Sequence, residues 1–252
     1  MTGKSEDLSA LLLGARRTDT LLGALPAELV PADPAAAYAA QDSVARAFGT
    51  IAGWKVGASS PFAEPNCAPL FAELMAPSPA EWPAARFHRR GVEAELAFRF
   101  GKSLPARPAG YNDDEVWEAI DTLHVAIEIV ESRFADFPAT DKLLQLADNQ
   151  SNGAFCFGEP IAHWRAVDFL RQPVSLLIDG EEKVKAVGGN AAGHPGRLLT
   201  WLANHCAARG RGLAAGDIVT TGSHTGLVFA EPGAVVTARF PGLGEAKLRF
   251  AL

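Results

Sequence analysis

The stretch that decides the fold is Val92-Glu93-Ala94-Glu95-Leu96-Ala97-Phe98-Arg99-Phe100. Alternation along an extended strand places Val92, Ala94, Leu96, Phe98 and Phe100 on one face, and Glu93, Glu95, Ala97 and Arg99 on the other. The segment is therefore predicted to be a strand with one face in the core. Residues two apart on a strand are separated by roughly 6.6 Å, so both carboxylates can converge on one cation with bonds of about 2 Å. On a helix, the same spacing would point them apart.

A third glutamate, Glu128, lies within the apolar run VAIEIV, residues 125–130, which is predicted to be a buried strand. A carboxylate is costly to bury unless it is paired or bound to a metal. Three carboxylates without clustered histidine or cysteine favour a hard cation, Mg²⁺ or Mn²⁺. Two other interpretations stay open. An E-x-E pair on an amphipathic strand is commonly its solvent face, and Glu128 could be paired with Arg133 or Lys142.

Outward from these glutamates, short apolar runs separated by glycine and proline predict further strands. They are residues 51–57, 154–158, 174–181, 217–223, 234–240 and 246–250. One helix is predicted to begin near Asp113 and to place Val116, Ile120 and Leu123 on one face. Another is predicted from His194 to Arg209. Asp33 and Pro34 predict the start of a helix that runs to Phe48.

This order of elements predicts an α+β or mostly-β main domain, residues 51–252, preceded by a helical segment, residues 1–50. The 252 residues, of which 48% are hydrophobic and 21% charged, suffice for a large core. The net charge of −6 gives no sign of a nucleic-acid partner. Three cysteines without C-x-x-C spacing predict free thiols. No signal-peptide layout or membrane-length apolar run is found, so a cytoplasmic protein without membrane contact is expected.

The order of short motifs is more specific than any one of them. The motifs are Gly53-Trp54-Lys55-Val56-Gly57, Val92-Glu93-Ala94-Glu95, Glu128-Ile129-Val130-Glu131-Ser132-Arg133, Ala147-Asp148-Asn149-Gln150-Ser151, Gly193-His194-Pro195 with Trp201-Leu202-Ala203-Asn204, and Gly216-Asp217-Ile218-Val219-Thr220-Thr221-Gly222-Ser223. In this order and with these gaps, the chain resembles the 2-oxopent-4-enoate hydratase family of the fumarylacetoacetate hydrolase superfamily. The resemblance covers roughly residues 35–250.

The resemblance implies a mixed β-roll fold that binds Mg²⁺ or Mn²⁺ through Glu93, Glu95 and Glu128. It places Lys55 beside the substrate, on a loop whose glycines, Gly53 and Gly57, would permit close approach of a ligand. Ser223 is expected near the substrate carboxylate, and Asn149 is a second candidate for substrate binding. Glu73 is the nearest counterpart of an acidic family residue, which makes it a candidate base. His224, next to Ser223, could also line the site.

The implied activity is a hydro-lyase reaction, as in aromatic catabolism, which adds water to a 2-hydroxy-2,4-dienoate and gives a 4-hydroxy-2-oxo acid. The implied partner is a small 2-oxo acid, and a homo-oligomer is expected. Three alternatives stay open: decarboxylation of a 2-oxo-diacid, hydrolysis of an acylpyruvate, and a degenerate, non-catalytic member. Related hydrolases use a His-Glu pair on a lid segment, whereas residues 58–75 contain no histidine, which argues against hydrolysis. Absence of a G-x-S-x-G elbow or P-loop excludes the serine-hydrolase and nucleotide-binding classes.

Overall fold

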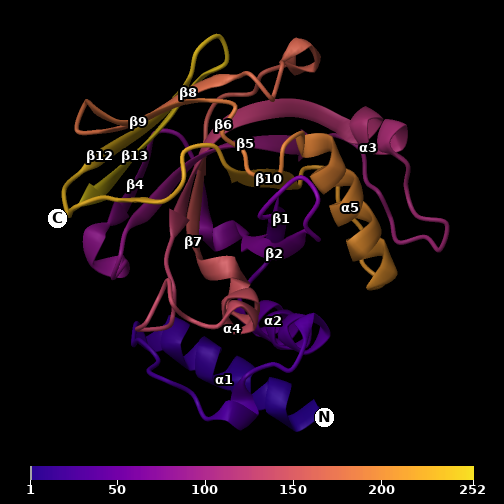
Figure 1. The fold of residues 1–252 in the computed structure, drawn as a ribbon, viewed down its shortest axis with the longest axis vertical. Helices are drawn as coiled ribbons and strands as arrows, with labels where there is room; N and C mark the ends of the chain where they lie inside the picture. Colours follow the sequence, from indigo (N-terminus) through magenta and orange to yellow (C-terminus); the bar gives the residue numbers. More distant parts are fainter. Residues whose placement is uncertain (1) are drawn as a thin grey trace.

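A computed structural model describes residues 2–252, which form two β-sheets with α-helices at the bottom and at the right in Figure 1. The α-helices are α1 (Thr2–Thr18), α2 (Pro34–Phe48), α3 (Asp113–Ala119), α4 (Lys142–Ala147) and α5 (Pro195–Ala208). The short 3₁₀ helices are η1 (Ala27–Leu29), η2 (Ala72–Leu74), η3 (Ala84–Arg86), η4 (Asn149–Ser151) and η5 (Trp164–Ala166). Within the described range, no helix is long and apolar enough to cross a membrane.

The larger sheet has the strand order β2-β1-β10-β5-β6-β7-β3, and β11 pairs with β5. These strands are β1 (Ile51–Gly57), β2 (Asn66–Phe71), β3 (Met75–Pro77), β5 (Gly91–Phe100), β6 (Ile120–Val130), β7 (Asn152–Phe157), β10 (Ile218–Ser223) and β11 (Val228–Phe229). The smaller sheet has the order β4-β13-β12-β8-β9. Its strands are β4 (Ala80–Pro83), β8 (Pro173–Ile178), β9 (Glu181–Val187), β12 (Val235–Phe240) and β13 (Gly244–Ala251). Both sheets mix parallel and antiparallel pairs, which confirms the predicted α+β class.

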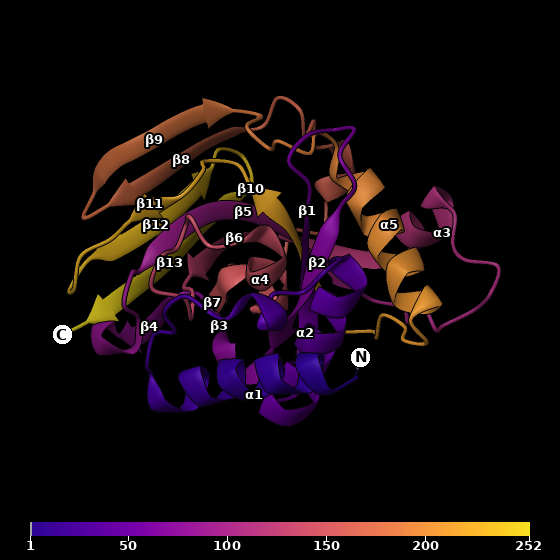
Figure 2. The same ribbon diagram turned by 60° about the horizontal axis from the view of Figure 1, so that its bottom comes forward.

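The two sheets pack face to face around the main hydrophobic core (Figure 2). The apolar face of β5 lies in this core, since Val92, Ala94, Leu96, Phe98 and Phe100 are all buried there. The alternation predicted for residues 92–100 is therefore confirmed. The opposite face of β5, which carries the two glutamates, is turned away from the smaller sheet.

One helix prediction was wrong at its C-terminal end. Helix α3 ends at Ala119, and Ile120 and Leu123 belong to β6 and not to the helix. Ile120 is already extended, with φ −83° and ψ 130°, and it pairs with Phe100 of β5. The pairing with β5 buries these side chains in the sheet core, and this tertiary contact outweighs the local helical spacing.

The N-terminal helices have a hydrophobic cluster of their own. Leu8 and Leu12 of α1 pack with Val44 of α2, with Leu144 of α4 and with Phe134. Asp33 caps α2 as predicted, because its Oδ1 accepts a hydrogen bond of 2.8 Å from the Ala36 backbone N–H. Figure 1 shows α2 beside α4 and α1 beneath both, at one end of the molecule. The division into two units at residue 50 stays a prediction.

Lys55 lies within β1 and not on a loop, which corrects the expectation for the glycines beside it. Gly53 serves a close approach between strands: a Cβ there would lie 2.1 Å from the Ile218 carbonyl oxygen of β10. At Gly57, by contrast, an added Cβ would meet no atom within 4 Å. Only Gly57 therefore borders open space.

Gly53→Ala is expected to destabilise the fold by about 1–3 kcal/mol, because the new methyl group would force β1 and β10 apart. Gly57→Ala is the matched control, and its unfolding free energy should stay within about 0.5 kcal/mol of wild type. Denaturant unfolding measures both. Equal midpoints for the two variants would contradict the close backbone contact at Gly53.

Candidate metal centre and cleft

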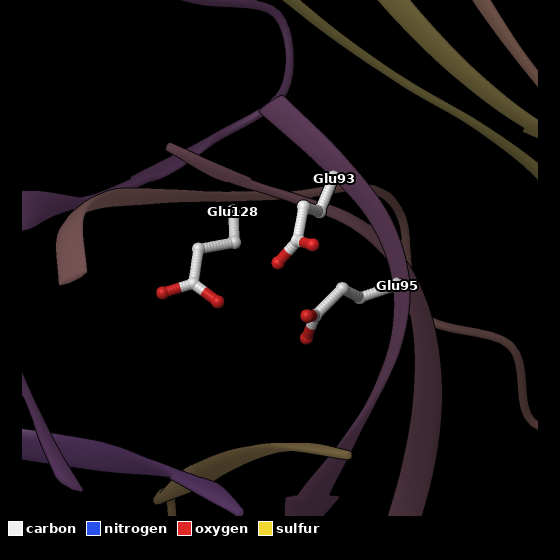
Figure 3. Close-up of side chains that lie close together, drawn as sticks. All are labelled: Glu93, Glu95 and Glu128. Atoms are coloured by element: carbon white, nitrogen blue, oxygen red, sulfur yellow. The ribbon is translucent and has the colours of Figure 1, made fainter. Parts of the chain in front are cut away.

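The three predicted glutamates converge on one point of the larger sheet. Glu93 lies directly opposite Glu128 in the antiparallel register of β5 and β6, and Glu95 follows on the same face of β5. One carboxylate oxygen from each residue lies within 4.8 Å of the others, and Figure 3 shows the three carboxylates facing a shared space. The expected convergence of the E-x-E pair with Glu128 is thus present in the structure.

This carboxylate cluster is buried and electrostatically unfavourable. Glu95 and Glu128 are each only 1% exposed. Burial, together with the charge of Glu128, raises the pKa of Glu93 to about 7. Burial and the charges of Glu128 and Glu93 raise the pKa of Glu95 to about 8. Like charges at this distance repel strongly in a poorly solvated site, so the cluster favours a neutralising cation.

Lys55 supplies part of that neutralising charge. Its Nζ donates to Glu128 Oε1 at 2.5 Å and to the Gln150 carbonyl oxygen at 3.0 Å. Burial lowers the pKa of Lys55, but the facing carboxylates of Glu128 and Glu95 outweigh it and hold that pKa above its usual value. Lys55 is therefore an ammonium at neutral pH. Glu128 pairs with neither of the two partners considered from sequence, and Arg133 binds Asp148 instead.

The residues present fit a divalent cation. One ammonium faces three carboxylates, and Glu128 Oε2 is buried without a hydrogen-bond partner. All donor atoms are carboxylate oxygens, which hard cations such as Mg²⁺, Mn²⁺ and Ca²⁺ prefer. Glu93, Glu95 and Glu128 are the residues that would hold it.

Two neighbouring side chains orient these carboxylates. The Thr220 hydroxyl donates to Glu95 Oε2, and Asn152 Nδ2 donates to Glu128 Oε1 at 2.9 Å. Sequence reasoning missed both residues, although each lies in or next to a motif quoted above. Thr220 belongs to Thr220-Thr221-Gly222-Ser223, and Asn152 directly follows Ser151.

Thr220→Val is expected to weaken divalent-cation affinity by about 10- to 100-fold, because it removes the hydroxyl that orients Glu95. Thr221→Val is the matched control, since that buried hydroxyl donates to the Leu96 carbonyl oxygen at 3.2 Å and touches no glutamate. Calorimetric titration with Mg²⁺ measures the affinity. Equal losses of Mg²⁺ affinity in the two variants would show that the effect comes from destabilisation of β10 and not from the contact with Glu95.

A cleft of about 310 Å³ opens over the carboxylates. Its polar and charged lining residues are Lys55, Ser59, Asn66, Glu93, Glu95, Glu128, Gln150, Asn190 and Ser223. Ser223 lies on the cleft wall, and its expected contact with a substrate carboxylate stays a prediction. Ser59 and Asn66 show that part of the segment 58–75 borders the cleft. The segment is anchored to α5, because Arg197 donates to the carbonyl oxygens of Ser60 and Ala63, each at 3.1 Å.

Comparison with known proteins places this geometry in a family. Residues 41–251 match the family model described as fumarylacetoacetate (FAA) hydrolase C-terminal. The chain belongs to this family. A 2-keto-4-pentenoate hydratase of Dechloromonas aromatica is 30% identical over 98% of this chain and 97% of its own length. A 4-oxalocrotonate decarboxylase of Pseudomonas putida is 31% identical over 63% of this chain and 59% of its own.

Solved structures show the same fold. A 4-oxalocrotonate decarboxylase from Pseudomonas putida G7, complexed with magnesium and adipate, superimposes with a TM-score of 0.85. The two chains are 26% identical, and the superposition covers 97% of each. The predicted fold of the fumarylacetoacetate hydrolase type, with helices at its N-terminus, is confirmed.

Three residues that the sequence analysis proposed for the substrate site do not line the cleft of this chain. Glu73 is exposed in η2, and its Oε1 accepts a hydrogen bond of 3.3 Å from the Thr50 backbone N–H, so it is not placed to act as a base. Asn149 is buried beneath β2, where its Nδ2 donates to the Pro69 carbonyl oxygen at 3.2 Å. His224 is buried, and its Nδ1 contacts the Gly188 carbonyl oxygen at 2.8 Å.

Gln150 reaches the cleft in place of its neighbour Asn149, through an unusual backbone turn. Asn149, Gln150 and Ser151 have φ values of 53°, 52° and 56°, in the left-handed region that non-glycine residues rarely adopt. Such strain persists only where the surroundings hold it. Here Asp148, directly before the turn, is fixed by Arg133, whose Nε donates to Asp148 Oδ1 at 2.5 Å. The turn aims the Gln150 carbonyl oxygen at Lys55.

Proposed function

We propose that this chain is a divalent-metal-dependent hydro-lyase that adds water to a 2-hydroxy-2,4-dienoate or 2-oxo-4-enoate and forms a 4-hydroxy-2-oxo acid. The observation that carries the proposal is the convergence of Glu93, Glu95 and Glu128 beside the Lys55 ammonium. Relatives along nearly the whole chain are named 2-keto-4-pentenoate hydratases, which supports the reaction type.

The proposed cation is Mg²⁺, with Mn²⁺ as the second candidate, held by the three glutamates. When bound, it supplies Lewis-acid polarisation of a 2-oxo carboxylate in the cleft. The related decarboxylase structure contains magnesium, which supports this choice.

Lys55 is proposed to act as the proton donor. Apart from the three glutamates, it is the only titratable side chain among the described residues that line the cleft. Its Nζ carries a proton at neutral pH, since the surrounding carboxylates raise its pKa. A positioned acid contributes typically about 10²–10⁴-fold to a rate.

The substrate is proposed to be a small 2-oxo acid. A cleft of about 310 Å³ admits only a small molecule. Beside the cation site, Ser223, Asn66 and Asn190 offer polar groups for its carboxylate and oxo oxygens. Gly222, which precedes Ser223, has a φ of 94°, a conformation that suits glycine and turns the chain toward the cleft.

Decarboxylation of a 2-oxo-diacid is the second candidate, because a decarboxylase shares the fold over 97% of the chain. Both reactions need the same cation and proton donor. Acylpyruvate hydrolysis is less well supported, since none of the described lining residues is a histidine. An intact set of three glutamates argues against a degenerate member.

Three further expectations belong to this proposal. The enzyme is proposed to act in the breakdown of aromatic compounds, to be located in the cytoplasm and to form a homo-oligomer. Metabolite analysis of a deletion strain, cell fractionation and sedimentation velocity test them separately.

A substrate panel tests the reaction type. Mg²⁺-loaded protein is offered 2-hydroxypenta-2,4-dienoate, a 2-oxo-hex-3-enedioate and an acylpyruvate, and products are identified by mass spectrometry. Water addition to the dienoate is the expected result. Release of CO₂ from the diacid alone would establish the decarboxylase instead, and cleavage of the acylpyruvate alone into two acids would establish a hydrolase.

A further inference from the structure

A second cavity, of about 280 Å³, lies between α1 and the segment that follows β6. It shares no lining residue with the metal cleft. Its wall combines apolar side chains, among them Leu21, Phe48 and Phe87, with several charged ones. The charged lining residues are Arg16, Asp19, Arg86, Glu131 and Arg133. Nothing in the proposed reaction uses this cavity.

Arg16 is a buried guanidinium with unused donors. Its side chain is 5% exposed, and its Nε and Nη2 have no hydrogen-bond partner. Burial and the nearby Arg133 lower the pKa of Arg16 to about 9, so it remains charged at neutral pH. Its Cζ atom lies 5.3 Å from the centre of the Phe48 ring, which helps to hold the guanidinium in place.

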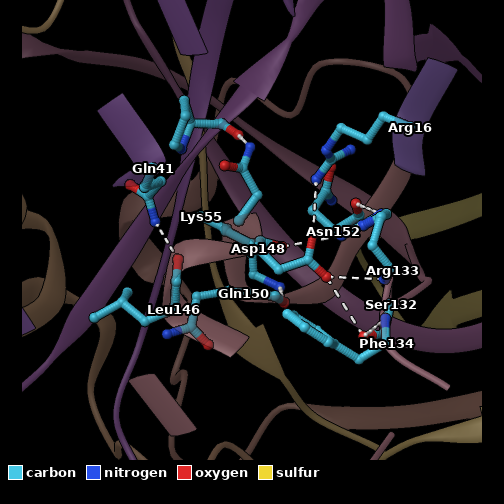
Figure 4. A network of polar contacts seen from close by, with 12 residues as sticks. Arg16, Gln41, Lys55, Ser132, Arg133, Phe134, Leu146, Asp148, Gln150 and Asn152 are labelled. Carbon is cyan, nitrogen blue, oxygen red and sulfur yellow. Dashed lines mark hydrogen bonds and ion pairs between the residues drawn. The ribbon is translucent and has the colours of Figure 1, made fainter. Parts of the chain in front are cut away.

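The nearest carboxylate is already engaged by other donors. Asp148 Oδ1 lies 3.5 Å from Arg16 Nη2 but accepts a shorter hydrogen bond of 2.5 Å from Arg133 Nε (Figure 4). Asp148 Oδ2 accepts a hydrogen bond of 2.9 Å from the Arg133 backbone N–H. Nε and Nη2 form one edge of the guanidinium, the edge that binds a carboxylate through two parallel hydrogen bonds. In Arg16, neither nitrogen of this edge has a hydrogen-bond partner, and Nη2 has only the 3.5 Å ion pair with Asp148.

Glu131 supplies the opposite charge on the same cavity wall. It is 5% exposed, and its Oε2 accepts a hydrogen bond of 2.8 Å from the Arg89 backbone N–H. Its Oε1 is buried without a partner. Arg16 and Glu131 both line the cavity yet form no ion pair with each other. Each buried charge is therefore left without its full complement of hydrogen bonds, which is costly unless a third group lies between them.

We propose that this cavity binds a small amino acid, with its carboxylate on the Nε/Nη2 edge of Arg16 and its ammonium at Glu131 Oε1. A zwitterion satisfies both unpaired groups at once and adds no net charge to the buried site. The apolar wall formed by Leu21, Phe48 and Phe87 accommodates an aliphatic side chain. A simple carboxylate would leave Glu131 Oε1 without a hydrogen-bond partner, and a simple amine would leave Arg16 Nε without one.

The test begins with thermal unfolding of the Mg²⁺-loaded protein in the presence of each of the twenty common amino acids, at about 10 mM. The amino acid that raises the Tm most is then titrated calorimetrically beside its deaminated and decarboxylated analogues. Only the amino acid is expected to bind. Failure of all twenty to raise the Tm, or equal affinity for the deaminated analogue, would overturn the proposal.

Variants locate the binding. Arg16→Gln and Glu131→Gln are each expected to weaken the amino acid's affinity by about 10- to 100-fold, since each removes a charged hydrogen-bond partner. Arg16→Lys keeps the buried charge but loses the two-donor edge, so it should weaken binding even if Arg16→Gln fails to fold. Arg17→Gln, on the exposed side of α1, is the matched control.

Glu95→Gln, in the metal centre, should leave the amino acid's affinity unchanged. If Glu95→Gln loses amino-acid binding while Arg16→Gln and Glu131→Gln keep it, the amino acid binds in the metal cleft, and the proposal of a second site is wrong. The outcome does not depend on the proposed reaction, because binding is measured without turnover.

Discussion

Glu95→Gln is expected to lower kcat/KM by about 10³-fold or more, because several kcal/mol of charge stabilisation depend on the cation that Glu95 helps to hold. Calorimetric titration should show weaker Mg²⁺ binding in parallel. The metal-free variant should unfold at a temperature no lower than the metal-free wild type. The pKa of Glu95 is raised to about 8 in this site, so glutamine replaces a buried group that is already largely uncharged at neutral pH. Misfolding would instead lower that temperature.

The matched control is Glu118→Gln, at an exposed glutamate of α3, which should behave as wild type in all three measurements. Wild-type turnover in Glu95→Gln would remove the metal centre from the mechanism. Lost turnover with unchanged Mg²⁺ affinity would show that Glu95 acts directly on the substrate and is not a ligand.

Lys55→Met is expected to lower kcat by about 10²-fold or more, because it removes the only proton donor proposed for the cleft. Methionine keeps most of the packing of the lysine stem. Mg²⁺ affinity should not fall, since Lys55 offers no oxygen ligand and its ammonium competes for Glu128 Oε1. Single-turnover kinetics and calorimetry separate the two effects.

Lys142→Met, at an exposed lysine of α4, is the control for the loss of one positive charge. A kcat near that of wild type in Lys55→Met would assign Lys55 to a structural role, as the partner of a buried glutamate. A large loss of Mg²⁺ affinity would show that Lys55 organises the carboxylates.

Local pattern predicted much of the fold. The alternation at residues 92–100 identified β5 and its buried face, and Asp33 with Pro34 marked the start of α2. The boundary between α3 and β6 was wrong because Val116, Ile120 and Leu123 have helical spacing, although Ile120 and Leu123 lie in a strand. The pairing of Ile120 and Leu123 with β5 decides between them, and such pairing over distance is not visible in a short window.

The convergence of the three glutamates was predictable because it needs only the strand β5 and its neighbour β6. Glu93 and Glu95 lie on one face of β5, and pairing with β6 brings Glu128 opposite them. Glu73 and Asn149 were misplaced because the spatial positions of η2 and η4 depend on contacts far away in the sequence. Gln150 was missed because its main-chain carbonyl oxygen, presented by a left-handed turn, acts on Lys55.

Metal-dependent hydration is tested by following water addition to the dienoate while Mg²⁺ is restored to the protein. Wild-type protein is freed of cations with a chelator and mixed with 2-hydroxypenta-2,4-dienoate, and the ultraviolet absorbance of the dienoate is recorded while Mg²⁺ is added. Negligible loss of absorbance is expected without Mg²⁺, with saturable recovery when Mg²⁺ is added and 4-hydroxy-2-oxopentanoate as the product. Undiminished turnover in the chelated protein, or no formation of this product at saturating Mg²⁺, would rule out a Mg²⁺-dependent hydratase.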